Sequence, residues 1–273
     1  MSTQSESLPP ILFPQIRSLP SKNGFIWLKA GWQLFKLAPG MAVLSSILMG
    51  FCSLLTAIVP VIGSVASTLL SPALVAGAFL IWQGLQQRGR IDLEDLFYGF
   101  KKHFEKLLLL GLLNIIAMTL AIVGGALLYI GILLGTASIT GFELASFAEQ
   151  AAQMKSLLDA PSMEILTSPL FTLILMGALL VMMLGVPVLM TQVFSPAFVV
   201  FYRMAPWDAM KASFHACLRN AWPYLAYSLG LAVLYLLGVL TLGLGLLIVV
   251  PIHVASNYYA MTDILGEIPI RAA

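Results

Sequence analysis

Four long runs of this sequence contain no charged residue, and they limit its fold more than any other feature. They extend over residues 37–87, 107–142, 165–202 and 220–262. One helical crossing of a bilayer needs about 20 apolar residues, so each run holds one or two crossings. Only 10% of all residues are charged, whereas a soluble domain carries roughly 25%. The chain is therefore predicted to be an all-α polytopic membrane protein.

Proline and glycine, which mark turns, divide these runs into six predicted spans. Val59-Pro60-Val61-Ile62-Gly63 separates the first two spans, and Gly238, Gly243 and Gly245 separate the last two. The spans cover about residues 40–58, 63–86, 107–135, 169–202, 222–242 and 246–264. They form a membrane domain over residues 24–265, preceded by a proline-rich tail at 1–23 that we expect to be disordered and followed by a short tail at 266–273.

The basic residues predict the orientation, because cytoplasmic flanks carry an excess of Lys and Arg. With six spans and the amino terminus inside, all 14 basic residues except Lys155 lie on the cytoplasmic side. Both termini are therefore expected in the cytoplasm, and the expected location is the bacterial inner (plasma) membrane. Residues 136–168 then form a periplasmic insertion, in which the spacing of Phe147, Ala151, Met154 and Leu158 predicts one amphipathic helix.

A short amphipathic segment precedes each pair of spans, which indicates a threefold internal repeat. A helix of this kind lies flat in the headgroup layer of a membrane. Two pairs of short matches support the repeat: Ser71-Pro72-Ala73 with Ser195-Pro196-Ala197, and Lys29-Ala30-Gly31-Trp32 with Lys211-Ala212-Ser213-Phe214. The aromatic residues predicted to lie at the interface are Trp32, Phe97, Phe100, Phe104 and Phe214.

Four prolines interrupt the predicted spans, namely Pro72, Pro187, Pro196 and Pro251. A proline inside a helix removes one backbone hydrogen bond and frees a carbonyl group. We expect these positions to be kinks that shape the packing of the helices. The alternative is that the freed carbonyls take part in a ligand site, as in transporters with broken helices.

His253 is the only Asp, Glu, Lys, Arg or His residue well inside a predicted span, and Asn257 lies one turn further along the same face. Gln192 and Asn114 add polar groups to spans four and three. An ionisable group in a membrane is a functional hypothesis by default. Hydrogen bonds between membrane helices, which average only about 0.6 kcal/mol each, explain such residues equally well as packing contacts. We favour the packing role and keep a solute path as the alternative.

Motifs for catalysis are absent from the sequence, which has no H-E-x-x-H, G-x-S-x-G, Walker loop or C-x-x-C. We therefore expect neither an enzyme nor a bound cofactor or metal. The net charge of +2 is too small for a nucleic-acid-binding protein. The expected partners are membrane lipid and either another membrane protein or a second copy of this chain.

Four short patterns together resemble a known family. They are Gly31-Trp32-x-Leu34-Phe35, Pro60-x-Ile62-Gly63, the Ser-Pro-Ala of span two, and Asp95-Leu96-Phe97-x-Gly99-Phe100. Over about residues 24–265 the chain resembles an uncharacterised family of proteobacterial six-span inner-membrane proteins. It is more loosely similar to the membrane domain of some glycerophosphodiester phosphodiesterases. The resemblance implies a fold and an inner-membrane location, and it brings no active site.

Two functions follow as hypotheses. The first is a non-enzymatic protein that organises membrane lipid or binds a partner, because three amphipathic segments on one leaflet are the most distinctive feature of the sequence. The alternative is a small-solute channel or transporter whose path passes His253, Asn257 and Gln192.

Overall fold

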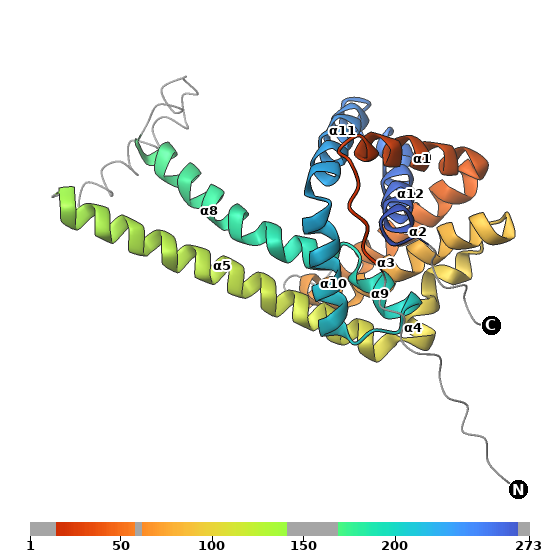
Figure 1. The fold of residues 1–273 in the computed structure, drawn as a ribbon, viewed down its shortest axis with the longest axis horizontal. Coiled ribbons are helices and arrows are strands. Elements are labelled where there is room, and N and C mark those ends of the chain that lie inside the picture. The colour runs from red at the N-terminus through yellow and green to blue at the C-terminus, as the bar shows by residue number, and fades with distance from the viewer. Residues whose placement is uncertain (1–14, 58–61, 141–168, 267–273) are drawn as a thin grey trace, which may run out of the picture. The chain divides into compact units, whose positions relative to one another are not determined.

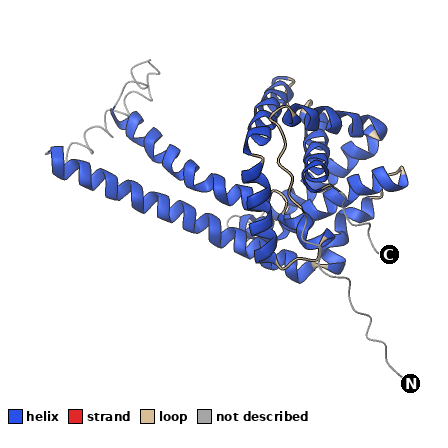
Figure 2. Ribbon diagram, viewed as in Figure 1, coloured by secondary structure: helices blue, strands red, loops and turns tan. Residues whose placement is uncertain are grey.

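The structure is a computed structural model that describes residues 15–57, 62–140 and 169–266. In these ranges every regular element is a helix (Figures 1 and 2), which confirms the all-α prediction. The elements are α1 (Asn23–Leu37), α2 (Pro39–Ala57), α3 (Ile62–Arg88), the 3-10 helix η1 (Leu93–Phe97), α4 (Tyr98–Lys102), α5 (Phe104–Thr140), α8 (Pro169–Gln192), α9 (Ser195–Phe201), α10 (Pro206–Arg219), α11 (Ala221–Leu240) and α12 (Leu246–Leu265).

Five helical stretches are long and apolar enough to cross a membrane. They are Pro39–Thr56, Ile62–Arg88, Phe104–Gly135, Phe171–Phe201 and Ala221–Leu240. The chain is thus a helical protein suited to several membrane crossings. The sixth predicted span corresponds to α12, which carries His253, Asn257 and Asp263 and is not among these five.

Proline and glycine set many of the helix ends. Pro39, Pro169 and Pro206 are the first residues of α2, α8 and α10, where the missing N–H group of proline is harmless. Gly89 and Gly266 follow α3 and α12 with φ of +70° and +75°. This left-handed conformation ends a helix and favours glycine.

Predicted span four, residues 169–202, is two helices in the structure. The chain leaves the helical conformation at Val193 and Phe194, between α8 and α9. Pro196 stands in the first turn of α9, a position where the missing N–H group of proline costs no helical hydrogen bond. Pro72, in contrast, lies inside an unbroken α3.

Residues 15–22, which belong to the tail expected to be disordered, make hydrogen bonds to other parts of the chain. The Asn220 side chain, which is fully buried, accepts a hydrogen bond from the Leu19 N–H and donates one to the Arg17 carbonyl, both at 2.9 Å. The Arg17 N–H donates to the Ile264 carbonyl, also at 2.9 Å. These bonds hold the segment in place despite its extended backbone. Residues 1–14, the tail at 267–273 and most of the predicted insertion, with its amphipathic helix, lie outside the described residues.

The described chain forms two compact units, of which the second is Ile116–Leu189. It consists of parts of α5 and α8. The Tyr129 hydroxyl donates a hydrogen bond to the Leu173 carbonyl, and the Tyr129 ring also lies against Gly177. Large apolar side chains such as Leu127 and Met183 face outward, as expected for helices in lipid.

The first unit contains the remaining described residues, up to Ile115 and from Met190 onward. Within it, α1 packs on α11 and α12 although almost the whole chain separates them (Figure 1). Trp27 of α1 is fully buried, and its ring contacts Tyr224 and Tyr227 of α11. Its Nε1 donates a hydrogen bond of 2.8 Å to Asp263 of α12. One tryptophan thus joins three helices.

Candidate functional site

The three amphipathic segments of the sequence correspond to α1, to η1 with α4, and to α10, which we call the short segments. The middle segment follows Asp92, a residue type that often caps the start of a helix. In the structure Asp92 makes no capping hydrogen bond, and the segment is a 3-10 turn followed by a short helix. The Asp92 carboxylate instead pairs with Arg88 and Arg90.

The predicted interfacial aromatic residues lie on these segments or next to them, where they stack on one another. Trp32 stacks on Phe35 with ring centroids 5.6 Å apart. Phe100 contacts both Phe97 and Phe104, at 6.3 and 6.0 Å, although these three rings come from three elements. Trp32 and Phe104 are exposed, whereas Phe97, Phe100 and Phe214 are partly buried.

Each short segment packs against a different long helix through one small residue. A methyl group at Gly31 of α1 would collide with the backbone of Ile252 and Ser256 in α12. One at Gly99 of α4 would collide with the backbone of Ala73 in α3. Small residues permit such close approach of helix backbones.

The third short segment uses a serine in the corresponding place. The Ser213 hydroxyl of α10 accepts a hydrogen bond of 3.0 Å from the Phe194 N–H and donates one of 2.7 Å to the Met190 carbonyl. These two backbone groups lie on either side of the break between α8 and α9. Ser213 therefore supplies the hydrogen bonds that the interrupted helix lacks.

Three of the four predicted helix-breaking prolines lie beside these contacts. Pro72 precedes Ala73, Pro251 precedes Ile252, and Pro196 follows the break at Phe194. Pro187 lies apart from them, inside α8. Three of the four prolines thus lie next to residues that contact a short segment.

The polar residues of α12 pair with tyrosines of α11. The His253 Nδ1 lies 2.9 Å from the Tyr235 hydroxyl, and the Tyr224 hydroxyl donates to the Asn257 Oδ1 at 3.3 Å. The Tyr227 hydroxyl donates to the His253 carbonyl at 3.2 Å. Both polar side chains predicted in span six thus have partners on the neighbouring helix.

Gln192 and Asn114, the other two residues of the predicted polar site, lie at the end of α8 and in α5. Among the described residues, no hydrogen bond joins either of them to His253 or Asn257. Asn114 is buried, and its Oδ1 has no partner among the described residues. The four residues therefore form no single hydrogen-bonded network.

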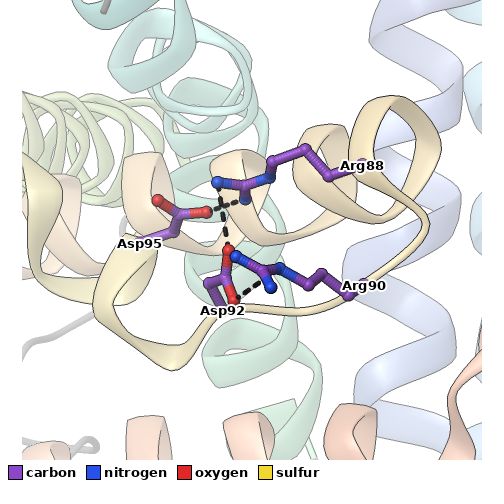
Figure 3. Close-up of polar contacts among 4 residues, drawn as sticks. All are labelled: Arg88, Arg90, Asp92 and Asp95. Atoms are coloured by element: carbon purple, nitrogen blue, oxygen red, sulfur yellow. Dashed lines mark hydrogen bonds and ion pairs between the residues drawn. The ribbon is translucent and has the colours of Figure 1, made fainter.

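A network of ion pairs lies where α3 ends and the middle short segment begins (Figure 3). The chain turns at Gly89, and the Arg88 guanidinium then reaches two carboxylates, those of Asp92, at 3.2 Å, and Asp95. Arg90 pairs with the other oxygen of Asp92 at 3.3 Å. The Asp95 side chain is only 6% exposed, so loss of the arginine would leave a buried carboxylate without a compensating charge.

This network forms one side of a cleft of about 960 Å³. Lys102, His103 and Arg203 also line the cleft. Arg203 comes from the turn after α9, and the Lys106 Nζ donates a hydrogen bond of 3.3 Å to its carbonyl. Burial lowers the pKa of His103 below its ordinary value of 6.5, and the cations of Lys106, Arg203 and Lys102 lower it further. The side of the cleft around His103 is therefore strongly positive.

This charged cleft was not predicted from the sequence. One local signal was available, because Arg88 and Arg90 precede Asp92 and Asp95 across a glycine and such charges pair when the chain turns back. Arg203 gave no such signal, since it is about a hundred residues away in the chain and only the fold brings it to His103.

Comparisons of the chain with protein-family models, with curated proteins and with solved structures gave no match. The resemblance to the proteobacterial inner-membrane family therefore stays a prediction.

Proposed function

We propose that this protein is a non-enzymatic, six-span protein of the bacterial inner membrane that organises the lipid or the proteins around it. Both termini would be cytoplasmic, and three repeats would each comprise a short segment and a hairpin of two spans. The observation that carries the proposal is the way in which the short segments contact the long helices.

The contacts follow a cyclic order. The middle short segment packs on α3, the second span of the first repeat, and α10 packs on α9, the end of the second repeat. α1 packs on α12, the second span of the third repeat. Each short segment thus contacts the hairpin of the repeat before it, and α1 closes the ring. A threefold repeat accounts for this order more simply than three independent contacts do.

The fixed position of the short segments supports a role at the membrane surface. Trp207, in the first turn of α10, and Trp222, in the first turn of α11, are 60% and 73% exposed. Trp32 and Phe104 are exposed as well. Aromatic side chains of this kind favour the headgroup layer. Apolar side chains held at one level by a rigid ring would act as a wedge in one leaflet.

The test replaces Phe97, Phe100 and Phe104 together with glutamine. A variant with leucine at the same three positions is the matched control, because it keeps the apolar surface. We expect the glutamine variant to lose its effect on lipid order, measured with a headgroup-level fluorescent probe in proteoliposomes, and to lose any co-purifying partner. If it orders lipid and retains partners as well as the leucine variant does, the proposal is wrong.

The transport hypothesis makes a different prediction. It requires that His253→Ala abolish solute flux in proteoliposomes while Tyr235→Phe, which removes only a hydrogen-bond partner, weakens it. The pairing of His253 and Asn257 with α11 supports the packing role instead. Unchanged flux in the His253→Ala variant would exclude a path through this residue.

A further inference from the structure

The two sides of the charged cleft differ in how their charges are balanced. On one side, Asp92 and Asp95 pair with Arg88 and Arg90, and the exposed Glu94 also lines the cleft. On the other side, Lys102 and Arg203 line the cleft beside His103, and Lys106 lies near the same histidine. None of these three cations forms an ion pair with any residue in the described ranges. Three like charges gathered in this way repel one another, so the arrangement favours an anionic ligand.

The backbone at Arg203 is a second, independent observation. Arg203 has φ of +54°, in the left-handed region. An L-residue pays roughly 1–2 kcal/mol for this conformation, and glycine adopts it without strain. A position that favours glycine on backbone grounds thus holds an arginine, and this residue lines the cleft. Strain of this kind is typical of residues retained for a function of their side chain.

The N-terminus of α5 adds positive electrostatic potential beside His103. His103 lies directly before α5, the longest helix of the structure as described, so the cluster surrounds the positive end of that helix's dipole. Helix N-termini flanked by Lys and Arg are well suited to phosphate groups.

We propose that Lys102 and Arg203 bind a phosphate group in this cleft, with the charge of Lys106 nearby. A phosphate offers several oxygens to donors that converge from different directions, and a guanidinium can bind two of them at once. The inference deepens the proposed function, on which it rests, by naming the chemical group that the protein would hold. The phosphate would belong either to a phospholipid headgroup of the inner leaflet or to a small soluble phosphate ester.

The experiment uses the full chain in dodecyl maltoside, a detergent without phosphate. Three probes are titrated at low ionic strength: short-chain phosphatidic acid, glycerol 3-phosphate, and the short-chain diacylglycerol that lacks the phosphate. We expect saturable binding of phosphatidic acid and none of diacylglycerol. Binding of glycerol 3-phosphate with similar affinity identifies a soluble ester as the natural source, whereas its absence identifies a lipid. Absence of binding by both phosphate probes overturns the proposal.

Variants assign the binding to the cluster. Arg203→Gly removes the guanidinium and relieves backbone strain, so the variant should fold at least as well as the natural chain. We expect its affinity to fall about tenfold, and Lys102→Gln to have a similar effect. Leu242→Gly is the matched control, because Leu242 also has a left-handed φ, of +56°, but lies between α11 and α12. Equal affinity of the Arg203→Gly and Leu242→Gly variants would overturn the proposal.

The proposal can fail without the proposed function, and the reverse also holds. The glutamine triple variant at Phe97, Phe100 and Phe104 retains all three cations. If it loses the effect on lipid order but still binds the phosphate probe, the two properties are separate. If the Arg203→Gly variant binds the phosphate probe as tightly as the natural chain while the triple variant loses its effect on lipid order, the phosphate site is wrong and the proposed function still holds.

Discussion

The polar side chains between α11 and α12 and those of the charged cleft differ in how they are paired. His253 and Asn257 each have a hydrogen-bond partner on α11, a helix apolar enough to cross a membrane. In the cleft, Asp92 and Asp95 are paired with arginines, but Lys102 and Arg203 have no carboxylate partner among the described residues.

The difference reflects the surroundings of the two regions. A polar group without a partner in hydrocarbon costs several kcal/mol, so membrane helices satisfy such groups within the protein. At the headgroup level, water and lipid are available, and surplus charge costs little. Pairing within α11 and α12 therefore indicates packing, while surplus charge at a helix end indicates a place for a ligand.

The largest effect is expected at Ser213, because its hydroxyl serves two buried backbone groups. Ser213→Ala leaves the Met190 carbonyl and the Phe194 N–H without partners, and each unmet group costs about 1–3 kcal/mol. We expect the free energy of unfolding, measured in mixed detergent micelles, to fall by about 3 kcal/mol. Ser53→Ala is the control, since this exposed hydroxyl bonds only to its own helix. Similar losses in both variants would contradict the prediction.

Asp95→Asn should have the next largest effect. The change removes the buried partner of Arg88, whose side chain is 37% exposed and so retains some hydration. Loss of one partner of a fully buried pair costs 3–5 kcal/mol, and partial exposure reduces this to about 2 kcal/mol. Glu94→Gln alters an exposed acid of the same segment and should change the unfolding free energy by less than about 0.5 kcal/mol. If Asp95→Asn changes the unfolding free energy as little as Glu94→Gln does, the buried pairing of Asp95 with Arg88 contributes nothing to stability and the prediction is wrong.

A smaller effect is expected for the His253–Tyr235 pair. Double-mutant cycles in a membrane protein give about 0.6 kcal/mol on average for hydrogen bonds between helices. A cycle of Tyr235→Phe and His253→Ala should give a coupling energy of that size. Tyr259→Phe, on the adjacent α12, is a control for the loss of a hydroxyl. A coupling energy above about 2 kcal/mol would exceed the measured range for packing contacts and would favour a functional role for the pair.

Much of the helical fold could be predicted because its signals are local. Charge-free runs and turn residues placed α2, α3, α5 and α11 to within a few residues of their observed ends. The break between α8 and α9 was missed, although Pro196 was recognised as a helix breaker. The sequence shows where a helix can break, but whether it breaks depends on a partner such as Ser213, which lies in a different element.

The contacts of the candidate sites were harder to predict, because they join distant parts of the chain. The pairing of Asn257 with Tyr224 and of the Arg17 segment with Asn220 requires the packing of α1, α11 and α12 to be known. The same holds for Arg203 beside Lys106. The hydropathy pattern shows that a polar residue lies within an apolar run. It does not show which of several tyrosines or arginines will pair with that residue.

The pKa of His103 reports on the charge around this side chain, and it makes the stability of the protein depend on pH. In the folded protein its pKa lies below 6.5 because of burial and the three cations, while in the unfolded chain it returns toward 6.5. As the pH falls through this interval, the unfolded state binds more protons, so His103 makes the protein less stable toward acid. Above pH 6.5 His103 is mostly neutral in both states and no longer lowers the free energy of unfolding. His103→Gln should remove this pH dependence of stability.

Nuclear magnetic resonance of labelled histidine can measure the pKa of His103 with and without glycerol 3-phosphate. A bound phosphate would place negative charge beside the imidazole and raise its pKa, because an opposite charge favours the protonated form. Arg203→Gly should raise the pKa in the free protein, since it removes one of the three cations, and the response should then need about tenfold more phosphate. A His103 that titrates at 6.5 or above in the free protein would mean that the cations do not act on it, and the contrast between the two regions would then rest on geometry alone.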